Sequence, residues 1–177
     1  MSRMKQRRPE TNEYASYYGR YTDLVPETDI LAAMEKEAAQ TQKVLASIDE
    51  KRGAFRYEPD KWSIKQLLGH VQDSEQVFTY RALTFARGAT VPLPGFDQNE
   101  FMASSSFDNS KVKDLAEGID AVRRASLSLY RGLDDAAWDR GGTASDNHVT
   151  VRALAYITVG HERHHMKILR ERYLGTT

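Results

Sequence analysis

Residues 150–174 of the chain read TVRALAYITVGHERHHMKILRERYL, and this stretch decides the fold. Its apolar residues recur at intervals of three and four, which is the period of one face of an α-helix. Thr150 can cap the start of that helix, and Gly175 directly follows its end. We therefore predict a long amphipathic helix, which has to bury its apolar face against other parts of the chain.

Three further stretches show the same period and are predicted as helices over residues 28–53, 60–88 and 112–133. Either Thr28 or Asp29 can cap the first of them, and either Asp60 or Ser63 the second. Four amphipathic helices bury their four apolar faces most simply by packing together. We expect an all-α fold, an antiparallel four-helix bundle with almost no strand.

The predicted connections differ in length. Residues 88–109 make a long connection between the second and third helices, and loops of this length in compact domains are often functional. We interpret this connection as a cover over a site at one end of the bundle. Residues 1–27 form an N-terminal extension, and residues 1–177 are expected to form a single domain.

Composition excludes several classes of function. The 25 basic and 25 acidic residues cancel, so no overall charge attracts nucleic acid or an anionic membrane. The basic cluster Arg3, Lys5, Arg7 and Arg8 is interpreted as a solvated terminus. The absence of cysteine excludes disulfides and thiolate metal sites. No apolar run reaches the ~20 residues of a membrane span, and the start lacks a signal-peptide core, so we expect a cytoplasmic protein.

The fourth predicted helix carries two histidines on its apolar side. At about 100° per residue, His161 and His165 fall inside the apolar arc, one turn apart. The opposite side, interpreted as a solvated face, carries Arg152, Arg163, Lys167 and Arg170. Two imidazoles stacked in this way can bind one metal ion. The alternative is a pair of hydrogen-bonded core histidines, since an unpaired buried polar group costs about 1–3 kcal/mol.

A metal held by this pair needs a third ligand, and three histidines remain. His164 lies at the edge of the apolar arc, and His148 precedes the helix as a loop or capping residue. His70 lies on the flank of the second helix's apolar stripe. That position allows an inward reach towards a neighbouring helix without requiring it, so the pattern alone leaves the third ligand open.

The chain resembles a known family at two motifs. Residues 62–75, WSIKQLLGHVQDSE, and residues 160–165, GHERHH, are similar in order and spacing to the motifs of the DinB-like superfamily, which includes the YfiT-like metal-dependent hydrolases. The intervening PGFDQNEF, residues 94–101, fits the same pattern. The resemblance covers nearly the whole chain after residue 28. It implies a homodimeric bundle with one divalent metal ion bound by His70, His161 and His165.

The resemblance also implies a range of chemistry. Zinc and nickel are the favoured metals, with manganese or iron also found in the family. A bound metal lowers the pKa of a coordinated water or thiol near neutral pH. Relatives include S-transferases that use bacillithiol, mycothiol or glutathione, and enzymes that isomerise maleylpyruvate. We therefore expect a hydrolase or a thiol S-transferase acting on a small molecule, with a low-molecular-weight thiol as a further cofactor in the second case.

Two glutamates are candidate proton acceptors. Glu162 follows His161 directly, and Glu75 lies near the centre of the second helix's apolar stripe, where an unpaired carboxylate is costly. Glu75 is alternatively a residue that orients a histidine. Asp73 is interpreted as a surface residue.

Two other classes of function remain open on the sequence. Residues 161–165 satisfy the His-Glu-x-x-His pattern of zinc peptidases, but residues 166–177 contain neither His nor Asp as a downstream third ligand. A peptidase is therefore disfavoured. A non-catalytic metal-binding or stress-response bundle, or one whose histidines only fix the helix register, is the main alternative to an enzyme.

Overall fold

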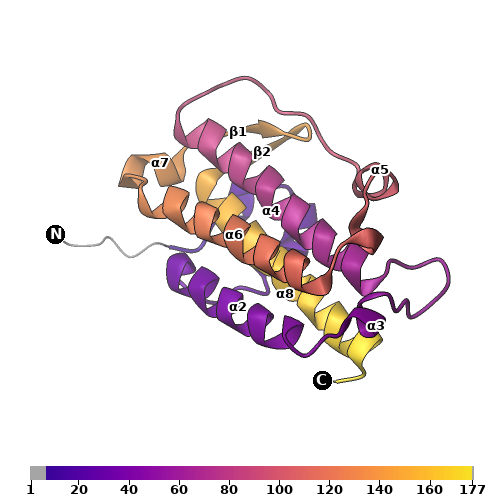
Figure 1. Cartoon of the computed structure of the whole chain (residues 1–177). Coiled ribbons are helices and arrows are strands. Elements are labelled where there is room, and N and C mark those ends of the chain that lie inside the picture. The colour runs from indigo at the N-terminus through magenta and orange to yellow at the C-terminus, as the bar shows by residue number, and fades with distance from the viewer. Residues whose placement is uncertain (1–6, 177) are drawn as a thin grey trace.

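The computed structural model describes residues 7–176, and four long helices form its frame (Figure 1). These helices are α2 (Ile30–Leu45), α4 (Ile64–Ala86), α6 (Val112–Arg131) and α8 (Val151–Ile168). The shorter α-helices and strands are α1 (Gly19–Thr22), α3 (Glu50–Gly53), α5 (Gln98–Ala103), α7 (Asp135–Asp139), β1 (Gly141–Ala144) and β2 (Asn147–Thr150). A π-helical segment, Leu169–Leu174, continues α8. The predicted four-helix bundle is confirmed. Within residues 7–176, no helix combines the length and apolar character that crossing a membrane requires.

Polar side chains cap the starts of three long helices. Asp29 accepts a hydrogen bond from the backbone three residues further on, at 3.0 Å, and starts α2. Ser63 and Gln66 form a reciprocal capping box at the start of α4, each side chain bonded to the other's backbone at 3.1 Å. Thr150 caps α8 in the same way. The structure thus selects Asp29 and Ser63 from the pairs of predicted caps.

The first long helix ends earlier than predicted, at Leu45. The backbone N–H groups of Ser47 and Ile48 donate to carbonyls three residues back, as in a 3-10 turn. The α-helical hydrogen-bond pattern therefore ends here. Asp49 then caps the separate short helix α3. Ile48 lies three residues after Leu45, which is the spacing of apolar residues on a helix face, and it is buried. It was therefore predicted as part of the helix, although it packs into the core from the turn that follows.

A β-hairpin before α8 was not predicted. Strands β1 and β2 pair antiparallel, with Gly141 opposite Thr150. Ser145 and Asp146 make the turn between them with φ values of 51° and 61°, and positive φ at both central residues is typical of tight hairpin turns. The hairpin delivers Thr150 to its capping position at the start of α8.

The four helices do not alternate in direction around the bundle. Helix α4 packs against α6 and α8, and α2 packs against the same two helices. The first apolar residues of α4 and α6 belong to one core cluster, so these neighbours begin at the same end and run parallel (Figure 1). The antiparallel neighbours are α4 with α8, and α2 with α6.

The parallel order of α4 and α6 explains the long connection between them. After the 23 residues of α4, about 35 Å of helix, the chain has to return to the end where it began. On the way it packs along α4: the Phe107 ring lies where a side chain on Gly69 would stand, and Arg81 donates a hydrogen bond to Pro94 O at 2.9 Å. The connection follows the side of α4, which corrects its predicted place over one end of the bundle.

The core consists of two apolar clusters. Members of one include Ile30, Met34, Phe78, Leu127 and Ile157, and members of the other include Leu45, Leu68, Ile119, Met166 and Tyr173. Buried polar side chains stand between these clusters on every long helix. We call them the polar layer: Glu37, Thr41, Ser74, Glu75, Arg123, Ser126, His161, Glu162 and His165, with His70 at the edge. The middle of the bundle therefore holds a polar layer between two apolar clusters.

The N-terminal segment from residue 7 to residue 27 is packed on α8. The backbone of Tyr21 lies so close to Gly160 that a Cβ there would come within 2.0 Å of the Tyr21 carbonyl oxygen. Within this segment, Thr22 and Val25 are fully buried. The Tyr156 hydroxyl donates hydrogen bonds to the backbone at Glu27 and Thr28. The extension is thus a structural layer of the domain.

This packing corrects two expectations about charged residues. Arg152 is 6 % exposed, and Arg163 is half-buried against Glu27 and Glu37 at 2.7–2.9 Å, so α8 has no fully solvated basic face. Arg7 pairs with the buried Glu13 and is part of the folded structure. Arg3 and Lys5, predicted in the same cluster, lie outside the described residues.

The close contact at Gly160 gives a first prediction. A Gly160→Ala substitution places its methyl group against the Tyr21 backbone, which cannot move without displacing α1, so the free energy of unfolding should fall by about 1–3 kcal/mol in urea titrations. Gly118→Ala is the matched control. Its methyl group meets only the flexible Gln72 amide, and alanine favours the helix, so no loss is expected. Equal stability of the two variants would contradict the packing described for residues 19–22.

Candidate metal centre

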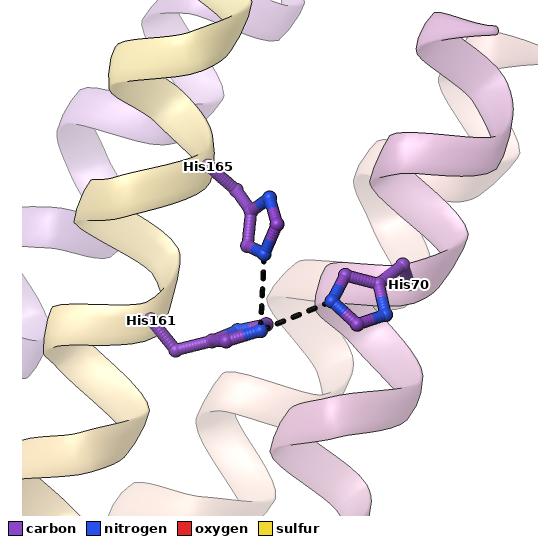
Figure 2. Close-up of side chains that lie close together, drawn as sticks. All are labelled: His70, His161 and His165. Atoms are coloured by element: carbon purple, nitrogen blue, oxygen red, sulfur yellow. Dashed lines mark hydrogen bonds between the residues drawn. The ribbon is translucent and has the colours of Figure 1, made fainter. Parts of the chain in front are cut away.

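Three buried histidines from two neighbouring helices point at one another (Figure 2). His161 and His165 lie one turn apart on α8, and His70 faces them from α4. The Nε2 atom of His161 is 3.1 Å from Nε2 of His70 and 3.1 Å from Nε2 of His165. One ligand atom from each residue falls within 4.8 Å of the others, so the structure brings together the three residues predicted as metal ligands.

The sequence places these side chains through its helix starts. Ser63 begins α4 two turns before His70, and Thr150 begins α8 three turns before His161. Glycines flank the site: Gly69 admits the Phe107 ring beside His70, and Gly160 admits the Tyr21 backbone beside His161. Close packing on both helices therefore fixes the direction in which each imidazole points.

Burial keeps the three imidazoles neutral. His70, His161 and His165 are 4 %, 5 % and 9 % exposed. Loss of hydration lowers the pKa of His70 to about 4. Burial, reinforced by the neighbouring imidazoles, holds the pKa of His161 and His165 well below the usual histidine range. A neutral imidazole keeps the nitrogen lone pair that a metal ion binds.

The donor set fits a divalent metal ion. With metal–nitrogen bonds of about 2.1 Å, two ligand nitrogens lie about 3.0–3.4 Å apart, and the two Nε2–Nε2 distances that involve His161 are both 3.1 Å. Three imidazoles that share one meeting point cannot all satisfy their nitrogens by bonding to each other. His165 Nδ1 is buried and has no hydrogen-bond partner among the described residues. A cation shared by the three Nε2 atoms accepts one lone pair from each imidazole. Nδ1 of His165 is the other nitrogen of its ring and is not among these ligand atoms.

Aromatic rings surround the histidines. Trp62 packs against His70 with ring centroids 5.0 Å apart, and Tyr21 and Phe78 pack against His161 at 5.2 and 5.6 Å. Phe96, from the long connection, lies 6.4 Å from Phe78. Three aromatic rings therefore pack directly on the histidines, and the connection between α4 and α6 adds Phe96 behind Phe78.

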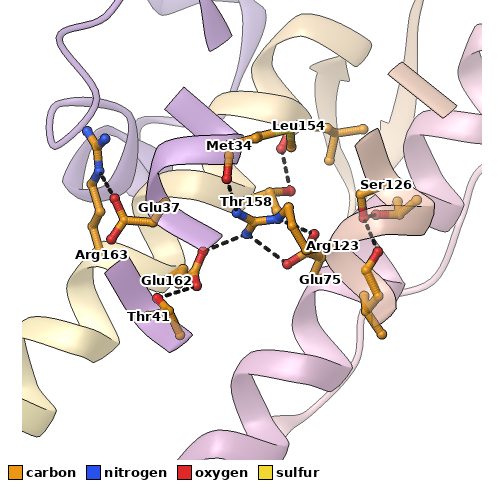
Figure 3. A network of polar contacts seen from close by, with 12 residues as sticks. Met34, Glu37, Thr41, Glu75, Arg123, Ser126, Leu154, Thr158, Glu162 and Arg163 are labelled. Atoms are coloured by element: carbon orange, nitrogen blue, oxygen red, sulfur yellow. Dashed lines mark hydrogen bonds and ion pairs between the residues drawn. The ribbon is translucent and has the colours of Figure 1, made fainter. Parts of the chain in front are cut away.

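The predicted catalytic glutamates lie in a different arrangement from the one expected (Figure 3). Both carboxylate oxygens of Glu75 accept hydrogen bonds from Arg123, at 2.8 and 2.9 Å. Glu162 accepts one from Arg123 at 2.6 Å and one from Thr41 at 2.7 Å. Within residues 7–176 neither carboxylate is hydrogen-bonded to the three imidazoles. Their role as proton acceptors stays a prediction.

The remaining candidates are not part of the three-histidine group, although the His164 ring packs against that of His165 with centroids 5.1 Å apart. His164 is half-buried on the neighbouring side of α8, and His148 is exposed on β2. Asp73, predicted at the surface, is half-buried, and its burial raises the pKa of the carboxyl group. The Glu of the His-Glu-x-x-His pattern, Glu162, is held by Arg123, which removes the arrangement that a zinc peptidase of this pattern requires.

Sequence reasoning missed Arg123. It lies four residues after Ile119 and three before Ser126, on the apolar stripe of its own helix, and a charge at such a position signals a buried ion pair. The contact of Tyr21 with His161 follows from how the N-terminal segment folds back over α8.

Fold and site together define a class, the four-helix bundle with a buried three-histidine group. The sequence model of the DinB superfamily matches residues 33–169, and the chain belongs to this superfamily. Among solved structures, YfiT from Bacillus subtilis, described as a probable metal-dependent hydrolase with an unusual four-helix bundle topology, matches with a TM-score of 0.71 at 15 % identity. The match covers 96 % of this chain and 95 % of that one. No curated protein matches the sequence.

The unpartnered nitrogen of His165 gives a second prediction. In the metal-free protein, His165→Leu removes a buried, unsatisfied polar atom and fills the space with an apolar side chain, so the free energy of unfolding should rise by about 1 kcal/mol. Chemical denaturation in the presence of a chelator measures the free energy of unfolding of the metal-free protein. Added metal should stabilise the wild type and the control variant His164→Leu but not His165→Leu. If the metal-free His165→Leu protein were less stable than the wild type, this would contradict the description of His165 Nδ1 as a buried atom without a hydrogen-bond partner among the described residues.

Proposed function

We propose that the chain is a divalent-metal-dependent enzyme in which His70, His161 and His165 bind one metal ion. The observation that carries this proposal is the convergence of three neutral imidazoles in the buried middle of the bundle, with Nε2 of His161 3.1 Å from Nε2 of both His70 and His165. When bound, the ion lowers the pKa of a coordinated water or thiol and polarises a substrate oxygen. The reaction is the attack of water or of a thiol on a small molecule, by a hydrolase or a thiol S-transferase.

Three imidazole ligands leave coordination positions for water and substrate, as catalytic metal sites require. Zinc or nickel suits this set best, with manganese and iron as further candidates. Of the two reactions, the description of YfiT as a probable metal-dependent hydrolase supports hydrolysis. The thiol S-transferase reading, with a low-molecular-weight thiol as cofactor, and the homodimer expected from the resemblance remain proposals.

The surrounding residues have defined tasks in this proposal. Trp62, Phe78 and Tyr21 hold the imidazole rings in place and keep bulk water from them. Arg123 holds Glu75 and Glu162, so that a proton acceptor has to come from this ion network or from the substrate itself. The network favours a positioning role for the two carboxylates.

A non-catalytic metal-binding bundle is the second candidate, and the depth of the site favours it. The ligands are at most 9 % exposed, as in a closed structural site. The two candidates differ in whether a bound metal exchanges a ligand with solvent. Cobalt-loaded protein titrated with azide or a small thiol distinguishes them, because a change in the visible spectrum requires an accessible coordination position, whereas an unchanged spectrum supports the structural role.

Metal content provides the third prediction. The purified, untagged wild type and the control His148→Ala should each contain about one divalent metal ion per chain by elemental analysis, whereas His161→Ala should contain none while its circular dichroism remains helical. His148 is exposed on β2, away from the trio, which makes it a matched histidine control. Absence of metal in the wild type after incubation with zinc or nickel would refute the proposed function.

A further inference from the structure

Arg123 is the most connected polar side chain of the polar layer. It is 1 % exposed, and its guanidinium makes four hydrogen bonds (Figure 3). Nε donates to Glu75 Oε1, Nη2 to Glu75 Oε2 and to Glu162 Oε2, and Nη1 to the Met34 carbonyl oxygen, over distances of 2.6–3.0 Å. Four of the five donors of the guanidinium are thus used.

Each partner of Arg123 comes from a different long helix. Met34 belongs to α2, Glu75 to α4 and Glu162 to α8, while Arg123 itself belongs to α6. Thr41 of α2 binds the second oxygen of Glu162 and so closes the network. One guanidinium therefore ties all four helices of the bundle at the same level.

Stability alone is a poor reason for such a network. Burying three charges costs desolvation energy that their attraction barely recovers, and apolar replacements of buried ion networks are often neutral or stabilising. What a planar fork with fixed donor directions provides is geometry. Apolar side chains can slide past one another by a fraction of a turn, whereas a bidentate ion pair is broken by the same shift.

The two glutamates of the network stand next to metal ligands. Glu162 follows His161 on α8, and Glu75 lies five residues, about 7.5 Å along the axis, beyond His70 on α4. A rigid helix transmits a shift of Glu75 to His70 and a shift of Glu162 to His161. The distance between the two Nε2 atoms thus depends on the register at which Arg123 holds both carboxylates.

We propose that Arg123, bidentate to Glu75 and bonded to Glu162, is a positioning residue that sets the axial register of α4 against α8 and thereby the ligand geometry of His70 and His161. This inference rests on the proposed metal site, and it adds a function for an ion network that touches none of the ligand nitrogens.

The test replaces the network by apolar side chains and measures metal binding separately from folding. In the triple variant Arg123→Met, Glu75→Leu, Glu162→Leu, no unpaired charge is left, and the Thr41 hydroxyl can bond to the backbone one turn back. We expect its metal-free thermal unfolding to stay close to the wild type. Its affinity for Co²⁺ and Zn²⁺, measured by chelator competition, should fall roughly tenfold to a hundredfold, with a changed visible spectrum of bound Co²⁺.

Two single variants complete the test. Arg123→Lys keeps the charge but has no fork, so its Co²⁺ affinity and spectrum should lie between those of the wild type and the triple variant. The control is Arg124→Met, at the exposed residue next to Arg123 on α6, and it removes a surface ion pair with Asp120. This variant should match the wild type in its Co²⁺ affinity and in the spectrum of bound Co²⁺. If the triple variant does not fold, the Lys variant decides the question by the same readouts.

The outcomes separate this inference from the proposed function. A wild type that binds neither Co²⁺ nor Zn²⁺ overturns both. A wild type that binds metal, beside folded network variants with unchanged Co²⁺ affinity and spectrum, overturns the positioning role and leaves the metal site standing.

Discussion

The polar layer across the middle of the bundle constrains everything around it, because each buried charge and imidazole has to find a partner away from water. Arg123 satisfies the charged half of the layer by binding Glu75 and Glu162. The histidines form the other half. The apolar clusters on either side can tolerate small adjustments in packing, but hydrogen bonds with fixed directions cannot. The register of all four helices is therefore set at this level.

Helix α4 contributes a residue to both halves of the polar layer, His70 to the histidines and Glu75 to the ion network. Its position in the bundle makes this possible. His70 and Glu75 are five residues apart, which turns them about 140° from each other around the helix. One can then face α8 while the other faces α6, the two neighbours of α4. This arrangement needs α4 beside both partners, with α6 parallel to it. The long connection that carries Phe96 and Phe107 is the consequence of that order.

Stability and the proposed chemistry oppose each other at the histidines. Burial favours the neutral imidazole, which keeps one nitrogen lone pair for a metal ion, yet within residues 7–176 it also leaves His165 Nδ1 without a hydrogen-bond partner. Aromatic rings and the N-terminal segment compensate by packing tightly around α8, with Tyr21 against His161 and Arg163 tied to Glu27 and Glu37. A site that depends on such support is often less stable than an apolar core would be.

The sequence by itself determined the local features. The period of apolar residues predicted the four helices, Thr150 marked the start of the last one, and the spacing of four residues placed His161 and His165 on one face, because helix geometry is a property of neighbouring residues. For the first two helices the sequence left two candidate caps each. The apolar pattern made the first predicted helix too long, because a buried turn residue such as Ile48 has the same spacing as a residue of the helix.

Only the tertiary structure decided which helices are neighbours and which polar groups meet. It selected His70 over His148 and His164, directed Glu75 and Glu162 to Arg123, and turned Arg152 and Arg163 inward beneath the N-terminal segment. The physical reason is that these contacts join residues far apart in the chain. The pattern of one helix shows that a polar side chain is buried, but its partner is fixed only when another helix packs against it.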